Sequence, residues 1–264
     1  MDFPDSKARE IIAAYVKGER NFRGINLSRV YFANPDVRHF PSYDLSGADF
    51  SAGIFRSTFF GFANLQNCNF EGALVTNASF QRANMKKAKL SRIAGDDVNF
   101  AEVNLEEANL SQALIYHSSL SRSNLRNAIL TQANLSLSDL RGADLKGANL
   151  SFCVMGESLI DKADFRGAFE DHTVFGDSYE PGTIYPNGRI SQGAFRDDPY
   201  CENKAAFEEE LMQLYLGYYD SLVEDSENQL CKHPDCKRNR VNNSQLCKIH
   251  HFEMIQRVEC PFSH

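Results

Sequence analysis

The sequence predicts an all-β solenoid whose coils have four sides, followed by a small zinc-binding tail. Three observations lead to this fold class. From Leu45 to Phe165 every fifth residue is Leu, Phe, Ile or Met, apart from Val75 and Gly95. Positions twenty apart carry similar residues, and four of the seven cysteines follow position 230. Neither an α-helix, with period 3.6, nor a strand, with period 2, repeats at five for this long.

The second period, of twenty residues, gives the size of one coil. The residues just before every fourth large residue are all Asn or Asp: Asp44, Asn64, Asn84, Asn104, Asn124, Asp144 and Asp164. Another column alternates in charge through Arg82, Glu102 and Arg122, as expected for neighbours that stack. We therefore expect each coil to hold four five-residue repeats, with large and small apolar side chains filling a shared interior.

The N-terminal part is expected to cover the first coil. Residues 1–20 predict a capping helix, near Ser6–Val16, because an exposed solenoid end leaves unpaired backbone edges. The repeats are expected over residues 21–176. Phe22, Leu27 and Phe32 keep the spacing of five but are out of phase with later repeats, so an insertion within 33–41 must reset the register.

After the repeats we expect an irregular final turn at 177–200 and an amphipathic helix at 201–225, which either caps the last coil at the C-terminal end or lies along one side of the stack. The helix has an apolar stripe at helical spacing, made of Phe207, Leu211, Leu214, Tyr215, Tyr218 and Leu222. Within the repeats, Gly95 stands at a core position and predicts imperfect packing. Glu170 is also in the core phase, and we expect the register to slip there.

The repeat resembles the pentapeptide-repeat family, whose pattern is A-(D/N)-L-x-x. The matching stretches are LSGADF at 45–50, EEANLSQAL at 106–114 and RGADLKGANL at 141–150. The resemblance implies a right-handed quadrilateral parallel β-helix, and the handedness rests on the resemblance alone. It favours binding as a function, without indicating a particular partner.

One column of apolar residues falls on an outward phase and is a candidate partner-binding surface. We call it the Ile54 column, and its members are Ile54, Leu74, Ala94, Leu114, Asn134, Val154 and Val174. A contiguous apolar patch marks a contact surface, which either the 201–225 helix, a second copy in a homodimer or a partner protein would cover. Phe59 and Phe62 also fall on outward phases and are further candidates.

The tail at 228–264 predicts a structural zinc site. Cys231, Cys236, Cys247 and His250 provide four ligands with a short spacing at each end, which suits closed tetrahedral coordination in a small zinc knuckle. His251 is an alternative to His250, and His233, Cys260 and His264 are further candidate ligands. So few apolar residues accompany the ligands that metal binding must supply the folding energy. A closed site leaves no position for an activated water.

Charge and composition favour a non-enzymatic interaction scaffold with protein partners. The net charge is −7, while six Lys/Arg against three Asp/Glu make the tail basic. No nucleophile motif, phosphate loop or dinucleotide fingerprint is present, so we expect no small-molecule substrate. No apolar run reaches the roughly 18 residues of a membrane helix, and no secretory signal is evident, which predicts a cytoplasmic protein without membrane association.

Two alternative functions stay open. Some pentapeptide-repeat proteins mimic duplex DNA and protect type II topoisomerases, but residues 40–175 contain 15 Asp/Glu against 12 Lys/Arg, a small excess for a DNA mimic. The basic zinc knuckle could instead bind nucleic acid through sequence-independent phosphate contacts, with a steep salt dependence.

Overall fold

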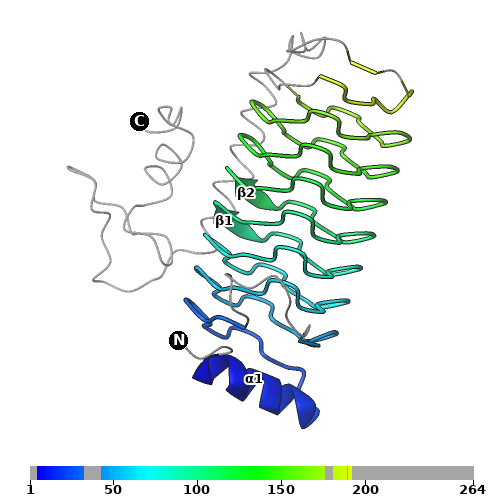
Figure 1. Cartoon of the computed structure of the whole chain (residues 1–264). Helices are drawn as coiled ribbons and strands as arrows, with labels where there is room; N and C mark the ends of the chain where they lie inside the picture. Colours follow the sequence, from blue (N-terminus) through cyan, green and yellow to red (C-terminus); the bar gives the residue numbers. More distant parts are fainter. Residues whose placement is uncertain (1–4, 33–42, 176–180, 189, 192–264) are drawn as a thin grey trace, which may run out of the picture. The chain divides into compact units, whose positions relative to one another are not determined.

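A computed structural model describes residues 5–32, 43–175, 181–188, 190 and 191. These residues belong to one compact unit, Met1–Cys201. Its elements are helix α1 (Ser6–Val16) and the short strands β1 (Ala94–Asp96) and β2 (Leu114–Tyr116). Most of the remaining described chain forms a stack of coils, with α1 at the N-terminal end of the stack (Figure 1).

Parallel bridges between residues twenty apart hold the coils together. They run from Asp44–Asn64 to Asp164–Ile184, and β1 pairs with β2 in the same register. Each coil contributes one bridge residue per side, in four columns. The predicted period of twenty is therefore confirmed, and the described repeats form a β-helix solenoid.

The corners between sides use a left-handed backbone conformation. The second residue after each large core residue has a positive φ, as at Asn127 (54°) and Leu137 (59°). A hydrogen bond closes most of these turns, as from Ala63 N–H to the Phe60 carbonyl at 3.1 Å. Gly and Asn adopt this conformation readily, whereas a residue such as Leu does so at an energetic cost that the paired coils must offset.

The interior contains the residues that define the repeat of five. Leu105, Leu125 and Leu145 have no exposed surface, although they belong to successive coils. In the earlier coils Phe replaces Leu: the Phe60 and Phe80 rings stack with centroids 5.4 Å apart, and the next pair, Phe80 and Phe100, stack at 5.1 Å. Stacked rings one coil apart fill a column continuously and add to the burial of apolar surface.

The first coil carries the predicted change of phase. Asn21 bridges Asp49, 28 positions later, which is eight more than the usual spacing. The insertion expected within 33–41 lies outside the described residues. Helix α1 begins at an Asp5 cap, whose carboxylate accepts hydrogen bonds from Ala8 N–H (2.9 Å) and Tyr31 N–H (2.8 Å). Ala8 and Ile11 extend the hydrophobic core of the coils into the helix.

Gly95 is not a packing defect, so that expectation was wrong. A Cβ atom at this position would lie 2.6 Å from the Thr76 nitrogen and 2.8 Å from the Val75 carbonyl carbon. The backbone of β1 therefore approaches the preceding coil more closely than any side chain allows. Glycine is required there for contact between coils.

The expected slip of register at Glu170 was also wrong. Phe169 bridges Asn149 and Val174 bridges Val154, so the spacing of twenty continues on both sides of Glu170. It reaches Ile184, within the segment expected as an irregular turn. There the chain reverses, since Ile184 and Ile190 form an antiparallel bridge.

Three corners along one edge depend on serine hydroxyls. The backbone N–H groups of Val98, Ser118 and Ser138 donate to Ser118, Ser138 and Ser158 Oγ respectively, each one coil further on. At the usual corner the equivalent N–H donates to the carbonyl three residues earlier. These serines are buried, so each hydroxyl satisfies an amide that water does not reach.

Replacing Ser138 by Ala is expected to destabilise the protein by about 1–3 kcal/mol, because the buried Ser118 N–H loses its acceptor. Denaturant unfolding followed by circular dichroism measures the change. Ser123→Ala is the matched control, since the Ser123 hydroxyl is also buried but donates only to the Leu120 carbonyl. Equal losses in the two variants would contradict the role of the serine ladder.

Candidate interaction surfaces

The Ile54 column is less accessible than its outward phase suggested. Ala94 is 2%, Leu114 6% and Asn134 5% exposed, and the other members are half-buried. Three of its seven members are therefore buried, and a role of the column in partner binding stays a prediction. The 201–225 segment expected to cover it lies outside the described residues.

The two outward phenylalanines also differ from the expectation. Phe59 is only 7% exposed, because its ring folds over Gly61, where an added Cβ atom would lie 2.4 Å from the ring. Phe62 is half-buried, and the Arg82 guanidinium lies 5.7 Å from its ring centroid. Phe59 therefore offers little surface to a partner, and Phe62 is partly engaged by its neighbour.

The exposed large apolar side chains of the coils lie elsewhere, on two other sides. Ile129 is 42% and Phe169 65% exposed, and both belong to one bridged column through Asn149. Leu159, at 37%, lies on another side. None of these three residues was singled out as a candidate from the sequence. Their phase relative to the core residues indicated an outward position, but each is the exception in a column that is otherwise mainly polar.

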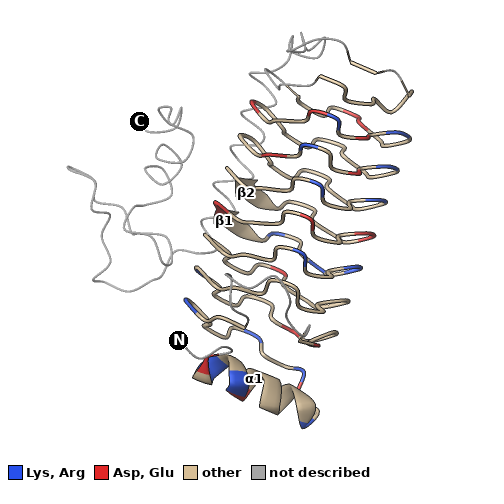
Figure 2. Ribbon diagram, viewed as in Figure 1, with Lys and Arg blue, Asp and Glu red and all other residues tan. Residues whose placement is uncertain are grey.

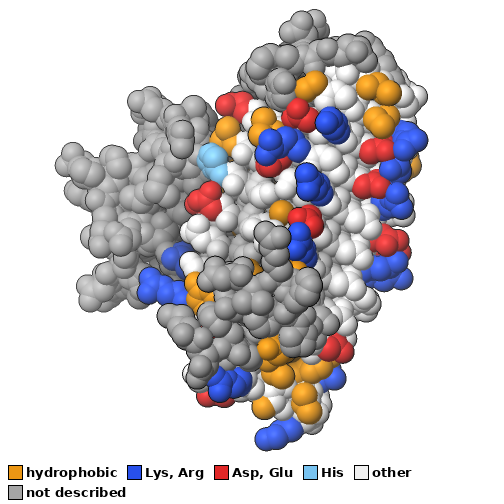
Figure 3. Space-filling model, viewed as in Figure 1, with side chains coloured by type: hydrophobic (Ala, Val, Ile, Leu, Met, Phe, Trp, Pro, Cys, Tyr) orange, Lys and Arg blue, Asp and Glu red, His pale blue; other side chains and the backbone are white. Residues whose placement is uncertain are grey.

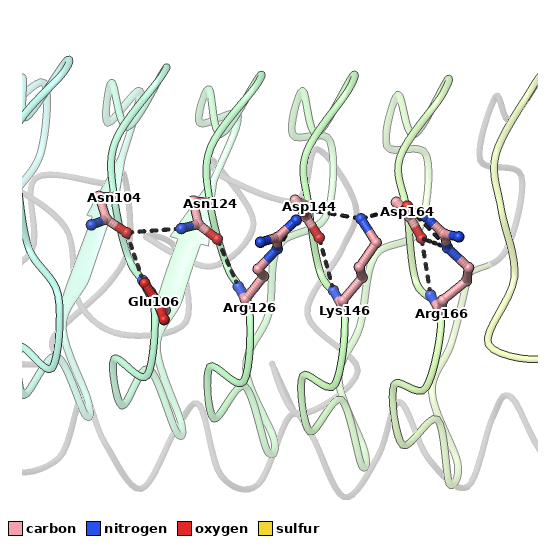
Figure 4. A network of polar contacts seen from close by, with 8 residues as sticks. All are labelled: Asn104, Glu106, Asn124, Arg126, Asp144, Lys146, Asp164 and Arg166. Atoms are coloured by element: carbon pink, nitrogen blue, oxygen red, sulfur yellow. Dashed lines mark hydrogen bonds and ion pairs between the residues drawn. The ribbon is translucent and has the colours of Figure 1, made fainter.

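A polar ladder follows the column of Asn and Asp residues. Asn124 Nδ2 donates to Asn104 Oδ1 at 3.1 Å, and Asn104 in turn donates to Asn84 at 3.2 Å. Each side chain also accepts from the backbone N–H two residues later, as Asn124 does from Arg126 at 3.2 Å. One side chain thus joins two coils and fixes its own turn, which explains the uniform Asn and Asp of this column (Figure 4).

In the last coils the amide ladder becomes a row of ion pairs (Figure 4). Lys146 Nζ lies 3.1 Å from Asp144 and 2.7 Å from Asp164. Arg126 pairs with Asp144 and Arg166 with Asp164, both at 2.7 Å. The Arg126 and Arg166 side chains are 51% and 54% exposed, whereas the carboxylates beneath them are 24% and 13% exposed.

These contacts change the acidity of the shielded carboxylate. Hydrogen bonds from the Arg166 guanidinium, with further help from Lys146, hold the pKa of Asp164 well below its usual range, despite opposing desolvation. In earlier coils of the stack, Arg82 and Glu102 are 2.9 Å apart, which confirms the predicted pairing of these stacked charges. Figure 2 shows charges of both signs interleaved along the coils.

The described cysteines are structural. Cys68 and Cys153 occupy small core positions and are buried. Burial raises the pKa of the Cys68 thiol to about 12 and raises that of Cys153 as well. Both are therefore protonated at neutral pH and are poor nucleophiles or metal ligands.

The expected zinc ligands Cys231, Cys236, Cys247 and His250 lie outside the described residues, as does His251. Within the described ranges, His, Cys, Asp and Glu side chains form no group of three or more that suits a metal ion. The same ranges contain no helix with the length and apolar character needed to cross a membrane.

Comparison with known proteins identifies the repeat. The family "Pentapeptide repeats" matches in eight copies, over residues 44–80, 60–93, 96–132, 118–155 and 138–169. This part of the chain is therefore made of pentapeptide repeats, as the resemblance in sequence predicted. No curated protein matches the sequence significantly.

Several solved structures are similar to the chain. HetL, a pentapeptide repeat protein involved in heterocyst differentiation regulation from Nostoc sp. strain PCC 7120, is 25% identical over 69% of this chain and 98% of its own, with a TM-score of 0.26. A pentapeptide repeat protein from the Arabidopsis thaliana thylakoid lumen is 27% identical over 41% and 65%, with a TM-score of 0.20. Full-length QnrB1, a plasmid-mediated fluoroquinolone resistance protein, is 16% identical over 72% and 99%, with a TM-score of 0.24. With scores this low, the assignment of the fold depends on the bridges and the family match.

Replacing Asp164 by Asn is expected to lower stability near neutral pH. The folded-state pKa of Asp164 is depressed, so its stabilising contribution is complete above the unfolded pKa of about 3.9 and declines as the pH falls further. Urea unfolding between about pH 7 and pH 2 should therefore show that the wild type has a larger free energy of unfolding than Asp164→Asn, and that this difference narrows below about pH 4. If this difference in the free energy of unfolding did not change over the pH range, the depressed pKa of Asp164 would be contradicted. When Arg166 is already replaced by Gln, Asp164→Asn should lower the free energy of unfolding by less than it does in the wild type.

Proposed function

We propose that this pentapeptide-repeat protein is a non-enzymatic protein-interaction scaffold. In this proposal the β-helix presents a binding face to a protein partner, and a C-terminal zinc knuckle provides a second contact. The observation that supports it best is the unbroken register of the described coils, which holds outward columns at a fixed spacing of one strand layer. A surface of this kind displays side chains in rows and forms few concave sites, which suits recognition better than catalysis.

The distribution of exposed side chains supports the same proposal. Ile129, Leu159 and Phe169 are exposed on a stack in which several charged side chains are paired with one another, as Arg126 is with Asp144 and Arg166 with Asp164. Figure 3 shows hydrophobic side chains among charges of both signs on one face of the molecule. Exposed apolar groups with charged neighbours are typical of protein-binding surfaces, in which apolar contacts give affinity and charges give specificity.

We propose that helix α1 caps the N-terminal end of the β-helix. Its apolar residues Ala8 and Ile11 continue the hydrophobic core, and Asp5 ties the start of the helix to Tyr31. A cap of this kind prevents the edge of the first coil from pairing with another molecule. Binding would then take place on the sides of the stack.

Protection of a type II topoisomerase by DNA mimicry is the alternative implied by the family resemblance. It requires a row of exposed negative charges, as on a phosphate backbone. In the described coils, carboxylates such as Glu102, Asp144 and Asp164 are paired with Lys or Arg, and the last two are less exposed than the cations over them. Recognition of a protein surface accounts better for this arrangement.

For the second contact, we propose that Cys231, Cys236, Cys247 and His250 bind one structural zinc ion. The spacing of these four residues and the few apolar residues around them support the proposal. Lys232, Lys237 and Arg238 lie between or beside the ligands in sequence and would give the knuckle a basic surface. Such a surface suits an acidic partner protein.

A first test of the scaffold uses the full-length protein as bait in native lysate, followed by titration of the recovered partner in purified form. We expect the triple variant Ile129→Ser, Leu159→Ser and Phe169→Ser to weaken partner binding by about tenfold or more, since it removes three exposed apolar contacts. Circular dichroism would establish that the variant keeps its fold. If no purified protein binds the wild type, the scaffold proposal is wrong.

The zinc site is tested by elemental analysis of the purified protein. We expect about one zinc ion per chain, lost on replacement of Cys236 by Ser, because a closed site needs all four ligands. Cys153→Ala is the control, since Cys153 is buried in the coil interior at a position where other coils carry Ala, as at Ala113 and Ala133. A zinc content that is unchanged in Cys236→Ser would exclude this ligand set.

A further inference from the structure

Three successive coils near the C-terminal end of the stack repeat one four-residue pattern. It consists of a cation, a corner residue, Ala and an outward residue, and it reads RNAI at 126–129, KGAN at 146–149 and RGAF at 166–169. In the two preceding coils the same columns read KKAK at 86–89 and EEAN at 106–109. The combination of a cation with an apolar outward residue is thus confined, in these columns, to the last of these coils.

The bridges place equivalent residues of these patterns above one another. Ile129 pairs with Asn149, which pairs with Phe169, so the two apolar residues share a column and lie two coils apart. With strand layers about 4.8 Å apart, their separation along the stack is about 9.6 Å. Arg126 and Arg166 have the same separation because they occupy the same positions in the same coils.

In the first and third of these coils, both the cation and the outward residue of the pattern are accessible to solvent. Ile129 and Phe169 are 42% and 65% exposed, and the Arg126 and Arg166 side chains are 51% and 54% exposed. The middle coil carries Lys146, which is only 30% exposed and lies between two carboxylates. We call the four accessible residues, Arg126, Ile129, Arg166 and Phe169, the Arg–apolar edge. It consists of two equivalent units, one in each coil, separated by the coil that carries Lys146 and Asn149.

The two arginines keep hydrogen-bonding capacity for a ligand. A guanidinium carries five N–H donors. Within the described chain, Arg126 donates to a side chain only from Nε, to Asp144 at 2.7 Å, and Arg166 donates from Nε and Nη2 to Asp164. The aspartates thereby fix the guanidinium planes, while terminal N–H groups of both arginines remain for a carboxylate from outside.

We propose that the Arg–apolar edge binds an amphipathic α-helix of a partner protein that carries a carboxylate and an apolar residue, both repeated after seven residues. This inference rests on the proposed function and adds the chemistry of the partner. Seven residues of helix span about 10.5 Å, close to two coils, and residues seven apart lie on one face. In an extended strand the residue at a similar distance, three positions on, points to the opposite side.

The edge suits a protein helix better than two other occupants. A nucleic acid would bring phosphates near Asp144 and Asp164, which lie directly beneath the cations. A second copy related by two-fold symmetry would place Arg126 and Arg166 against the same residues of its partner, and like charges in contact are unfavourable. A helix that carries both carboxylates and apolar residues complements the two arginines and the two apolar residues of the edge.

The probe is a fluorescein-labelled, Ala-rich peptide of about 20 residues, long enough to be partly helical, with Glu and Leu each placed at two positions seven apart. Fluorescence anisotropy with the full-length protein at about 0.05 M salt should show saturable binding that weakens at about 0.5 M salt, because partly exposed ion pairs are screened. Peptides with Lys in place of Glu, or Ser in place of Leu, should not bind.

Matched variants connect the binding to the edge. Phe169→Ser and Arg126→Gln should each weaken it by about tenfold. Val16→Ser and Arg141→Gln remove an exposed apolar residue of helix α1 and a salt-bridged arginine, both outside the edge, and they should change the affinity less than about twofold.

Every other outcome overturns the assignment. Absence of saturable binding, or equal losses in the edge and control variants, would exclude a helix site at this edge and leave the partner titration above unaffected. Dimerisation of the wild type that Phe169→Ser abolishes would show that a second copy occupies it. Slow labelling of a Phe169→Cys thiol in the monomeric protein, relative to a Leu159→Cys thiol, would show that the chain's own residues cover it.

Discussion

The structure depends on one constraint: residues twenty apart must lie over one another, so that every side of a coil can pair with the next. A strand layer of one or two residues has no stability by itself. Its backbone groups find partners only in adjacent coils, as Leu125 N–H does at the Asp144 carbonyl, 2.7 Å away. The core, the polar ladder and the ion pairs all follow from this register, since each is a column of residues that the pairing brings together.

Much of the fold could be predicted because its information is periodic. The spacing of five identifies the interior, and the sorting of Asn and Asp at twenty identifies the coil. The two errors within the stack arose where a single residue broke the pattern. Gly95 meets the backbone of another coil, and Glu170 leaves the bridges beside it unchanged. The periodicity of the sequence reveals such exceptions, but their structural consequences depend on contacts between coils that the sequence does not specify.

The candidate surfaces were harder to predict, because exposure is a property of the assembled coils. Leu114 and Phe59 were expected outward from their phase, yet they are only 6% and 7% exposed, whereas Phe169, which was not singled out from the sequence, is 65% exposed. A glycine two residues away lets the Phe59 ring lie flat, whereas Phe169 has no such neighbour on its C-terminal side. The pairing of Arg126 and Arg166 with recessed carboxylates likewise requires knowledge of which columns are adjacent.

The extra eight residues between the first two coils have a consequence for how such a protein can change in length. They leave the pairing of Asn21, Asn26 and Tyr31 with the next coil intact, so the stack accepts extra residues between Tyr31 and Asp44 without losing its pairing. Adding five residues inside a coil would instead rotate every later column by a quarter turn and separate each ladder from its continuation. Duplication of a gene segment is therefore compatible with this architecture when it adds a whole coil. An inserted segment that is not a whole coil is compatible with it only at a corner.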